Sequence, residues 1–277
     1  MSAYLRPRSL SDAIDALSQN PGVRIVAGGT DVYPALGENV TRASLLDITG
    51  IAALRGVDLT GDGLHIGALA SWSDVQRAAL PPGYRALQQA GREVGAPQIQ
   101  NCGTVVGNIC NASPAADGTV ALMALGAQVA ITGPAGTRRI PLTEFVTGAR
   151  QVALARDEIV TALHLPPAPG RSAFLKLGAR KYMVISIAMV AASVETDPAG
   201  HIARAAVTVG ACSPVAQRQP MLEAALTGAT RDDLTGIVRA DLLTGLSPID
   251  DARAPSAYRD DVVPVLIRRT LAACLEG

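Results

Sequence analysis

One stretch rich in glycine, hydroxyl and amide side chains, Gln100–Gly118, constrains what this chain can fold into more than any other. It contains Gly103, Gly107 and Gly118. Glycine reaches backbone conformations that other residues avoid, and it lets a ligand approach the main chain closely. Successive backbone N–H groups can then form an anion-binding concavity. The stretch therefore predicts a loop that binds phosphate, and a tight connection rich in turn-forming residues is the alternative.

A second glycine-rich turn favours the binding interpretation. The apolar segment Arg24–Val26 predicts a short buried strand, and it leads directly into Ala27–Asp31 with its paired glycines. This arrangement can aim backbone N–H groups at a diphosphate. The turn lacks the G-x-G-x-x-G fingerprint, so a nicotinamide-binding Rossmann fold is poorly supported. Taken alone, the turn is better explained as a structural connection than as a binding site.

Composition excludes several classes of function. The chain has 277 residues, enough for two or three subdomains, and its 24 basic side chains balance 24 acidic ones. A protein that binds nucleic acid or an anionic membrane normally carries a basic excess, so neither partner is expected. Aromatic residues make up only 3% of the chain, which argues against a stacking platform for bases.

The sequence also indicates where the protein resides and whether it binds a metal ion. The longest apolar run, Met183–Val194, is shorter than the roughly 20 residues that span a bilayer, so no membrane span is expected. The opening residues, Met1–Pro7, lack the apolar core of a signal peptide. We expect a cytoplasmic protein. Its four cysteines lack C-x-x-C spacing and its three histidines are isolated, so no metal site is expected in this chain.

The first 165 residues predict a mixture of short strands and helices. Predicted strands cover 24–26, 45–48, 64–66 and 128–132, and predicted helices begin at Ser11 and Ser71 or cover 84–94 and 119–126. Both serines can accept the free backbone N–H groups of a first helical turn. The order lacks the regular alternation of a doubly wound sheet, so it predicts an α+β fold.

The composition changes abruptly at Pro166–Gly170, where three prolines prevent a helix or strand from continuing. We place a domain boundary there. The following segments predict three antiparallel strands, at 173–177, 184–194 and 202–210, and then helices near 216–226, 231–242 and 262–275. Asp197–Gly200 predicts the hairpin turn between the second and third strands.

Further short motifs accompany the two glycine-rich segments in a fixed order. They are Tyr4–Pro7, Ser11–Ala13, Ala27–Asp31, Gln98–Asn108, Ala112–Asp117, Asp157–Val160, Lys176–Arg180 and Ala257–Arg259. In this order and spacing the chain resembles the FAD-binding medium subunit of the molybdenum hydroxylases, the family of xanthine dehydrogenase and carbon monoxide dehydrogenase. The resemblance covers nearly the whole chain.

The resemblance implies an α+β fold of the p-cresol methylhydroxylase and vanillyl-alcohol oxidase (PCMH/VAO) type. Two N-terminal α+β subdomains, 1–57 and 58–166, would grip FAD. The C-terminal domain, 171–277, would be of the CO dehydrogenase flavoprotein type, with a three-stranded antiparallel sheet and helices.

The resemblance also implies which residues hold FAD. Backbone N–H groups of 27–32 and 104–108 would wrap the diphosphate from two sides. Asp117 would bond a hydroxyl of the ribose or ribityl region, Val160 would meet the flavin through its main chain, and Lys176 would lie near the ring. The implied set is Ala27, Gly28, Gly29, Thr30, Asp31, Val32, Thr104, Val105, Val106, Gly107, Asn108, Asp117, Val160 and Lys176. No catalytic residue for substrate chemistry is implied.

Two of these residues leave alternatives open. A cation at Lys176 near the flavin N1 would stabilise the anionic reduced ring and raise its potential; the alternative is a surface lysine at a strand end. Val106 stands where the family commonly has the first of two glycines. A valine would be strained there if the position needed a positive φ, and it could press on the ligand. We favour a loop that tolerates Val106 over weaker FAD binding.

The implied function is electron transfer. The chain would carry FAD beside a small subunit with two [2Fe–2S] clusters and a large subunit with the molybdenum cofactor, in a dimer of heterotrimers. Electrons would leave through FAD to an acceptor that this sequence does not identify, and the substrate pocket would lie on another chain. The alternatives are a stand-alone flavoprotein oxidase of the same fold and a non-catalytic scaffold that has lost FAD.

Overall fold

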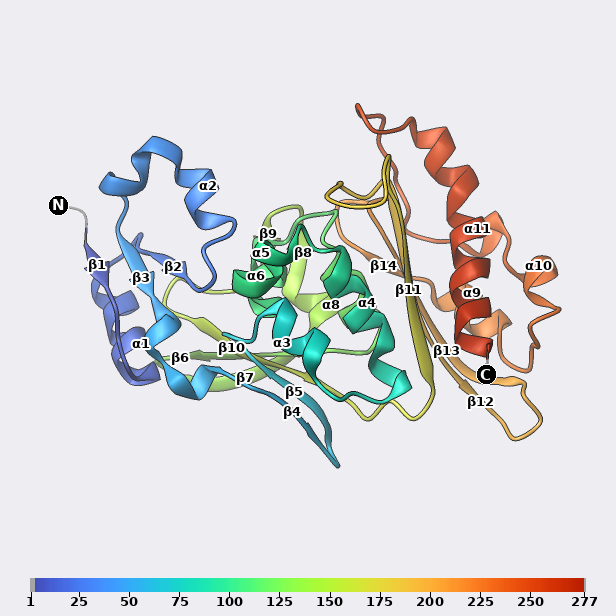
Figure 1. The fold of residues 1–277 in the computed structure, drawn as a ribbon, viewed down its shortest axis with the longest axis horizontal. Helices are drawn as coiled ribbons and strands as arrows, with labels where there is room; N and C mark the ends of the chain where they lie inside the picture. Colours follow the sequence, from blue (N-terminus) through green and yellow to red (C-terminus); the bar gives the residue numbers. More distant parts are fainter. Residues whose placement is uncertain (1–2, 277) are drawn as a thin grey trace.

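The computed structural model describes residues 3–276, and its N-terminal part is a small parallel sheet (Figure 1). In this sheet β3 (Leu45–Asp47) lies between β1 (Tyr4–Leu5) and β2 (Arg24–Val26). Helix α1 (Leu10–Gln19) begins after Ser9, whose hydroxyl accepts the Asp12 N–H at 3.1 Å. The prediction that Ser11 starts this helix was wrong, because Ser9 already supplies the capping oxygen.

The middle part is built on a five-stranded antiparallel sheet. Its strands, in spatial order, are β4 (Val57–Thr60), β5 (Gly63–Gly67), β10 (Ile159–Leu165), β6 (Gln128–Gly133) and β7 (Gly136–Pro141). The central strand β10 comes last in sequence and joins the two hairpins. Its residues are almost all buried, which explains their nearly continuous apolar pattern.

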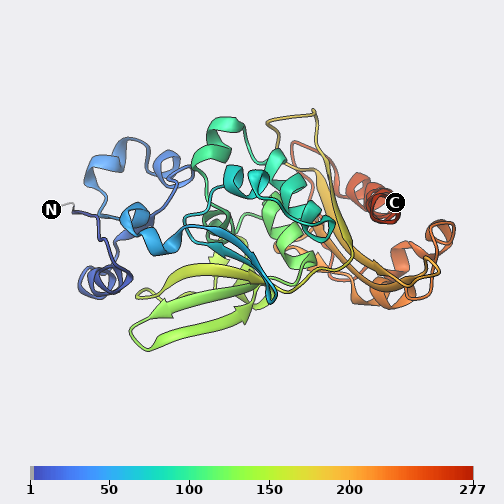
Figure 2. The same cartoon turned by 60° about the horizontal axis from the view of Figure 1, so that its bottom comes forward.

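Helices cover one face of this sheet (Figure 2). They are α3 (Trp72–Arg77), α4 (Arg85–Glu93), α5 (Pro97–Cys102), α6 (Val105–Asn111) and α7 (Asp117–Ala124). Every residue of α7 is buried, as expected for a helix that is apolar all round. Ser71 caps α3 through a complete capping box with Asp74, which confirms the predicted helix start. Short elements complete the region: α8 (Leu142–Phe145), β8 (Val146–Gly148) and β9 (Gln151–Val152). Helix α2 (Val32–Leu36) belongs to the N-terminal part, where Leu36 packs with Val26 and Leu45.

The C-terminal part is a second antiparallel sheet, which the connection Pro166–Gly170 joins to β10. Its strands are β11 (Arg171–Leu177), β12 (Ala188–Thr196), β13 (Ile202–Gly210) and the two-residue β14 (Gln217–Arg218). The three predicted strands are confirmed, and β14 is an addition. The second strand starts at Ala188 instead of Val184, because β11 ends at Leu177, which pairs with Ala188, so residues 184–187 have no strand opposite them.

Both faces of the C-terminal sheet are covered. Met189 and Ala191 of β12 face the core of the middle part, whereas Val190 and Ala192 face α11 (Ser256–Leu275) and the other C-terminal helices. A strand buried on both sides reads as a continuous apolar run. The other helices are α9 (Pro220–Ala225) and α10 (Leu234–Ile237). The helix expected over 231–242 is thus shorter, and α11 starts six residues before 262.

No helix among residues 3–276 combines the length and the apolarity needed to cross a membrane. The proposed first subdomain ends at Val57, which is the first residue of β4 in the middle sheet.

Two histidines give the middle sheet a predicted dependence on pH. His65 and His164 are register partners on β5 and β10, and their ring centroids lie 4.8 Å apart. Burial, with smaller contributions from Arg139 and His65, lowers the pKa of His164. Below pH of about 6.5 the unfolded chain therefore binds the proton more tightly, and the free energy of unfolding falls until the lower pKa is passed. When the pH is lowered below about 6.5, we expect the free energy of unfolding, measured in urea, to fall less in His164→Gln than in the wild type. An equal fall in both proteins would show that His164 is not the group responsible.

Candidate functional site

The two glycine-rich segments meet backbone to backbone. Ala27–Asp31 connects β2 to α2, and a Cβ atom added at Gly28 would lie 1.9 Å from the Cys102 carbonyl oxygen. Only glycine permits this approach. Gly29 has a φ of 72°, which favours glycine as well. We call this contact of Gly28 with Cys102 and Gly103 the glycine seam.

The stretch Gln100–Gly118 is mostly helical, so the prediction of a loop was wrong. It contains the end of α5, the whole of α6 and the start of α7. Thr104 begins α6 because its hydroxyl accepts the Gly107 N–H at 2.9 Å. Hydrogen bonds on either side, from Trp72 N–H to Gly103 and from Val105 N–H to Ala70, hold the segment against the start of α3.

A cavity of about 460 Å³ opens beside the seam, within the range of small-molecule sites. Every predicted site residue lines it except Val105, Asp117 and Lys176. Val105 is fully buried, and its N–H is already bonded to the Ala70 carbonyl at 3.0 Å. The structure thus brings together most of the predicted residues from three separate parts of the chain.

The sequence analysis missed most of the cavity's walls. The apolar ones include Leu17, Val23, Ile25, Ile48, Val94, Ile99 and Leu154, and the polar ones include Arg24, Asn111, Arg156 and Glu158. They come from elements far apart in sequence, so no local pattern identifies them. Of these wall residues, only Ile99 and Glu158 lie in the short motifs Gln98–Asn108 and Asp157–Val160. The Glu158 carboxylate accepts Arg138 at 2.8 and 2.9 Å, which lowers the pKa of Glu158.

Polar contacts tie the first glycine-rich segment to the second. The Asn111 amide at the end of α6 donates to the Asp31 carboxylate at 2.7 Å. Arg150 donates to the Asn111 side-chain oxygen and, at 3.2 Å, to its carbonyl. Asn108 on α6 has a side-chain oxygen that is buried without a hydrogen-bond partner. Such an oxygen can accept a hydrogen bond from a ligand in the cavity.

Val106 lies inside α6 with a helical backbone, so the position requires no positive φ. Its side chain is 4% exposed and packs in the main core while lining the cavity. The strain considered for this position is absent.

Replacing Val106 by glycine is therefore expected to harm the protein. Val106→Gly removes a buried side chain worth about 1.5–3 kcal/mol and adds a helix penalty near 1 kcal/mol. We expect the free energy of unfolding, measured in urea, to fall by about 2–4 kcal/mol, with no tightening of FAD binding. A variant that binds FAD more tightly than the wild type would restore the idea that Val106 presses on the ligand.

Asp117 and Lys176 form a buried ion pair just outside the cavity. Lys176 Nζ lies 2.7 Å from Asp117 Oδ2, and both side chains are 7% exposed. The lysine is therefore not the surface residue of the alternative reading. Nζ also lies 3.5 Å from the Glu93 carbonyl, next to Val94 in the cavity wall.

A third residue, Ser186, completes this pair and was missed by the sequence analysis. Its hydroxyl donates to Asp117 Oδ1 at 2.7 Å, so both carboxylate oxygens have a partner. Burial raises the pKa of Asp117, whereas Lys176 and Ser186 counter part of that rise. Within residues 3–276, no three His, Cys, Asp or Glu side chains converge as metal ligands.

Comparisons with known proteins identify this architecture. A family model described as the FAD binding domain in molybdopterin dehydrogenase matches residues 1–168, and the CO dehydrogenase flavoprotein C-terminal domain matches residues 173–274. The xanthine dehydrogenase FAD-binding subunit of Escherichia coli O157:H7 is 31% identical over 277 residues, covering 98% of this chain and 94% of that protein. The nicotinate dehydrogenase FAD-subunit of Eubacterium barkeri is 34% identical over 206 residues, covering 71% and 70%.

The fold agrees with these relatives. The structure of reconstituted CO dehydrogenase from Oligotropha carboxidovorans superposes with a TM-score of 0.91 at 26% identity, over 99% of this chain and 98% of that one. The resemblance found in the sequence and the expected fold class are both confirmed. The chain belongs to the family of FAD-binding subunits of the molybdenum hydroxylases and is an oxidoreductase subunit.

Proposed function

We propose that this chain binds FAD in the cavity beside the glycine seam and passes electrons from the [2Fe–2S] clusters of a partner subunit to an external acceptor. The observation that carries the proposal is the seam itself. It brings two backbone segments within van der Waals contact beside a cavity whose walls are largely apolar. An anionic diphosphate suits the backbone N–H groups of such segments, and flat apolar rings suit the walls.

The residues present fit this cofactor. The backbone N–H groups of Ala27–Val32 would hold the diphosphate from one side. In 104–108 the N–H groups of Val105, Gly107 and Asn108 are already bonded within the protein, which leaves those of Thr104 and Val106 for the other side. The unpartnered Asn108 oxygen would accept a hydrogen bond from the ligand. Val160 would contact the cofactor through its main chain. The Asp117–Lys176 pair would lie at the flavin end, close to the wall at Val94. Bound FAD would supply a redox centre that accepts and returns electrons, while the protein orients it and sets its electrostatics.

We propose that the partners are a small subunit with two [2Fe–2S] clusters and a large molybdopterin subunit, assembled as a dimer of heterotrimers in the cytoplasm. Relatives support a multi-subunit enzyme, since one is named the carbon monoxide dehydrogenase medium chain. Free cysteines, three of them at least partly buried, suit a reducing compartment. The divisions at residues 57 and 166 remain our proposal for the domains.

The rival functions have less support. A stand-alone oxidase needs its own base for substrate chemistry. Among the described residues the cavity is lined by no histidine or tyrosine, and its carboxylates Asp31 and Glu158 are already bonded to Asn111 and Arg138. A scaffold that has lost FAD drew its support from strain at Val106, and that strain is absent.

Purification with the native partners tests the proposed function. We expect one FAD per copy of this chain, together with iron and molybdenum on two further chains. FAD without those chains would favour the oxidase, and partners without FAD would favour the scaffold; either result would overturn the proposal.

A further inference from the structure

The loop between β11 and β12, residues 178–187, returns to the Asp117–Lys176 pair at its last two residues. Ser186 is 2% exposed and donates its hydroxyl to Asp117. The next residue, Ile187, donates its N–H to the Leu177 carbonyl at 2.8 Å. Since Leu177 follows Lys176 directly, this backbone bond fixes the distance between the serine and the lysine.

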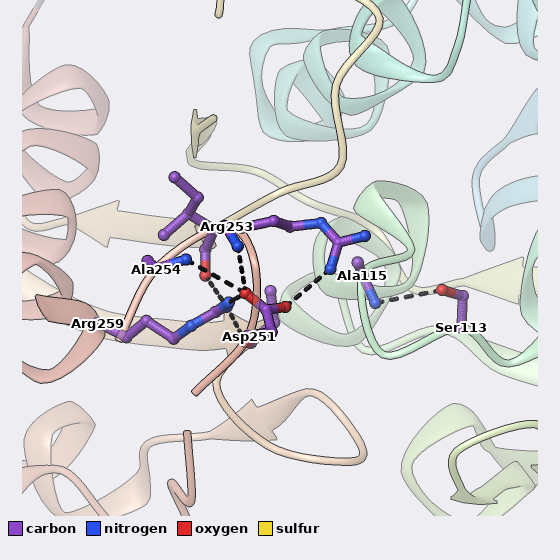
Figure 3. A network of polar contacts seen from close by, with 8 residues as sticks. Ser113, Ala115, Asp251, Arg253, Ala254 and Arg259 are labelled. Carbon is purple, nitrogen blue, oxygen red and sulfur yellow. Dashed lines mark hydrogen bonds and ion pairs between the residues drawn. The ribbon is translucent and has the colours of Figure 1, made fainter. Parts of the chain in front are cut away.

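An arginine from α11 bonds the other backbone group of Ile187, its carbonyl. Arg259 is 2% exposed, and its Nη1 donates to the Ile187 carbonyl at 2.5 Å and to the Ala211 carbonyl at 3.0 Å. Its Nη2 donates to Asp251 at 2.7 Å. Figure 3 shows the Asp251 carboxylate between Arg259 and Arg253. Ile187 is therefore bonded through both its N–H and its C=O.

The rest of the loop has fewer constraints. Tyr182, Met183 and Ile185 are between 51% and 62% exposed. Arg180 bonds the Met183 carbonyl within the loop, whereas the bonds that tie the end of the loop to the rest of the protein are made by Ser186 and Ile187. Arg259 also keeps a buried Nε without a hydrogen-bond partner. A buried cation with an unpaired donor costs stability, and the bonds of its Nη atoms to Ile187, Ala211 and Asp251 offset that cost.

We propose that Ser186 and Arg259 are positioning residues of the flavin site. Arg259 fixes Ile187, and Ile187 in turn fixes Ser186. The serine hydroxyl then orients the Asp117 carboxylate, so that its second oxygen meets Lys176. These contacts fix the position of the Asp117–Lys176 ion pair relative to the flavin. This inference rests on the proposed FAD function.

A matched pair of serine variants tests the inference in the full chain. Ser172 on β11 is also 2% exposed and makes one buried hydrogen bond, to the Ala86 N–H at 2.9 Å. It lies four residues before Lys176, or about 13 Å along the strand. Ser186→Ala should weaken FAD binding about tenfold, the equivalent of losing one hydrogen bond to a charged group, and should change the flavin midpoint potential.

Ser172→Ala should lower thermal stability about as much as Ser186→Ala does. Unlike Ser186→Ala, it should leave the FAD dissociation constant and the flavin midpoint potential unchanged. Ser186→Thr keeps the hydroxyl, so its flavin midpoint potential should equal that of the wild type. Arg259→Lys keeps the charge but loses the planar fork, and it should move the potential in the same direction as Ser186→Ala. A hydroxyl with only a structural role would not move the potential.

Two results would overturn the inference in different ways. If Ser186→Ala binds FAD as tightly as the wild type and at the same potential, the inference fails and the proposed function stands. If the wild-type chain itself binds no FAD, the proposed function fails, and the inference fails with it.

Discussion

Gly28→Ala is expected to abolish measurable FAD binding at micromolar concentrations. The added methyl group would lie 1.9 Å from the Cys102 carbonyl oxygen and 2.7 Å from its carbon. Backbone atoms cannot rotate away as a side chain can, so the two segments must separate. We expect the dissociation constant for FAD to rise at least about a hundredfold, which corresponds to about 2.7 kcal/mol. Overpacking should also cost about 1–3 kcal/mol of stability.

Gly61→Ala is the matched control. Gly61 lies in the turn between β4 and β5, where an added Cβ meets nothing within 4 Å and the φ is ordinary. This variant should bind FAD as the wild type does, by fluorescence titration, and should unfold at the same urea concentration. If Gly28→Ala bound FAD normally, the seam would not be the site of the diphosphate.

Lys176→Met is expected to have the second largest effect. The substitution leaves the Asp117 carboxylate buried with only Ser186 as a partner. Removing one member of a buried pair typically costs about 3–5 kcal/mol, because the other charge is left uncompensated. We also expect a lower flavin midpoint potential, since a nearby cation favours the anionic reduced ring. Urea denaturation and a redox titration of the full chain measure the two effects.

A double variant separates these two effects. Lys176→Met combined with Asp117→Asn leaves no unpaired charge, so it should recover part of the lost stability. The potential should stay low, because the cation is still missing. An unchanged potential in Lys176→Met would remove the proposed role of the lysine, even if stability fell as expected.

Local patterns predicted the C-terminal sheet well. The run up to Val194 is apolar because β12 is buried on both faces, and such a run is readable without tertiary information. The start of β12 was misplaced because it is set by the pairing of Ala188 with Leu177 at the end of β11, and the apolar run alone does not show where that pairing begins. The helical character of Gln100–Gly118 was missed because glycine and asparagine disfavour helices. Burial against neighbouring elements and the Thr104 cap outweigh that preference.

The candidate site, too, was predicted only in part from the sequence. The paired glycines Gly28 and Gly29 and the glycine-rich stretch around Gly103 suggested backbone binding, but their contact depends on the whole fold. Ser186 and Asp117 are 69 residues apart, and Arg259 and Ile187 are 72 apart. Contacts over such separations follow from topology and leave no periodic signal in the chain. The apolar cavity walls were missed for the same reason.

Hydrogen–deuterium exchange of the full chain, with and without FAD, tests the central claim most directly. Because a bound diphosphate would occupy free backbone N–H groups at the seam, we expect FAD to slow exchange in segment 27–32 and at Thr104 and Val106, whose neighbours Val105, Gly107 and Asn108 are already bonded within the protein. The β4–β5 turn around Gly61 should exchange at the same rate in both samples. Protection confined to other segments, or no protection at saturating FAD, would contradict a cofactor site at the glycine seam.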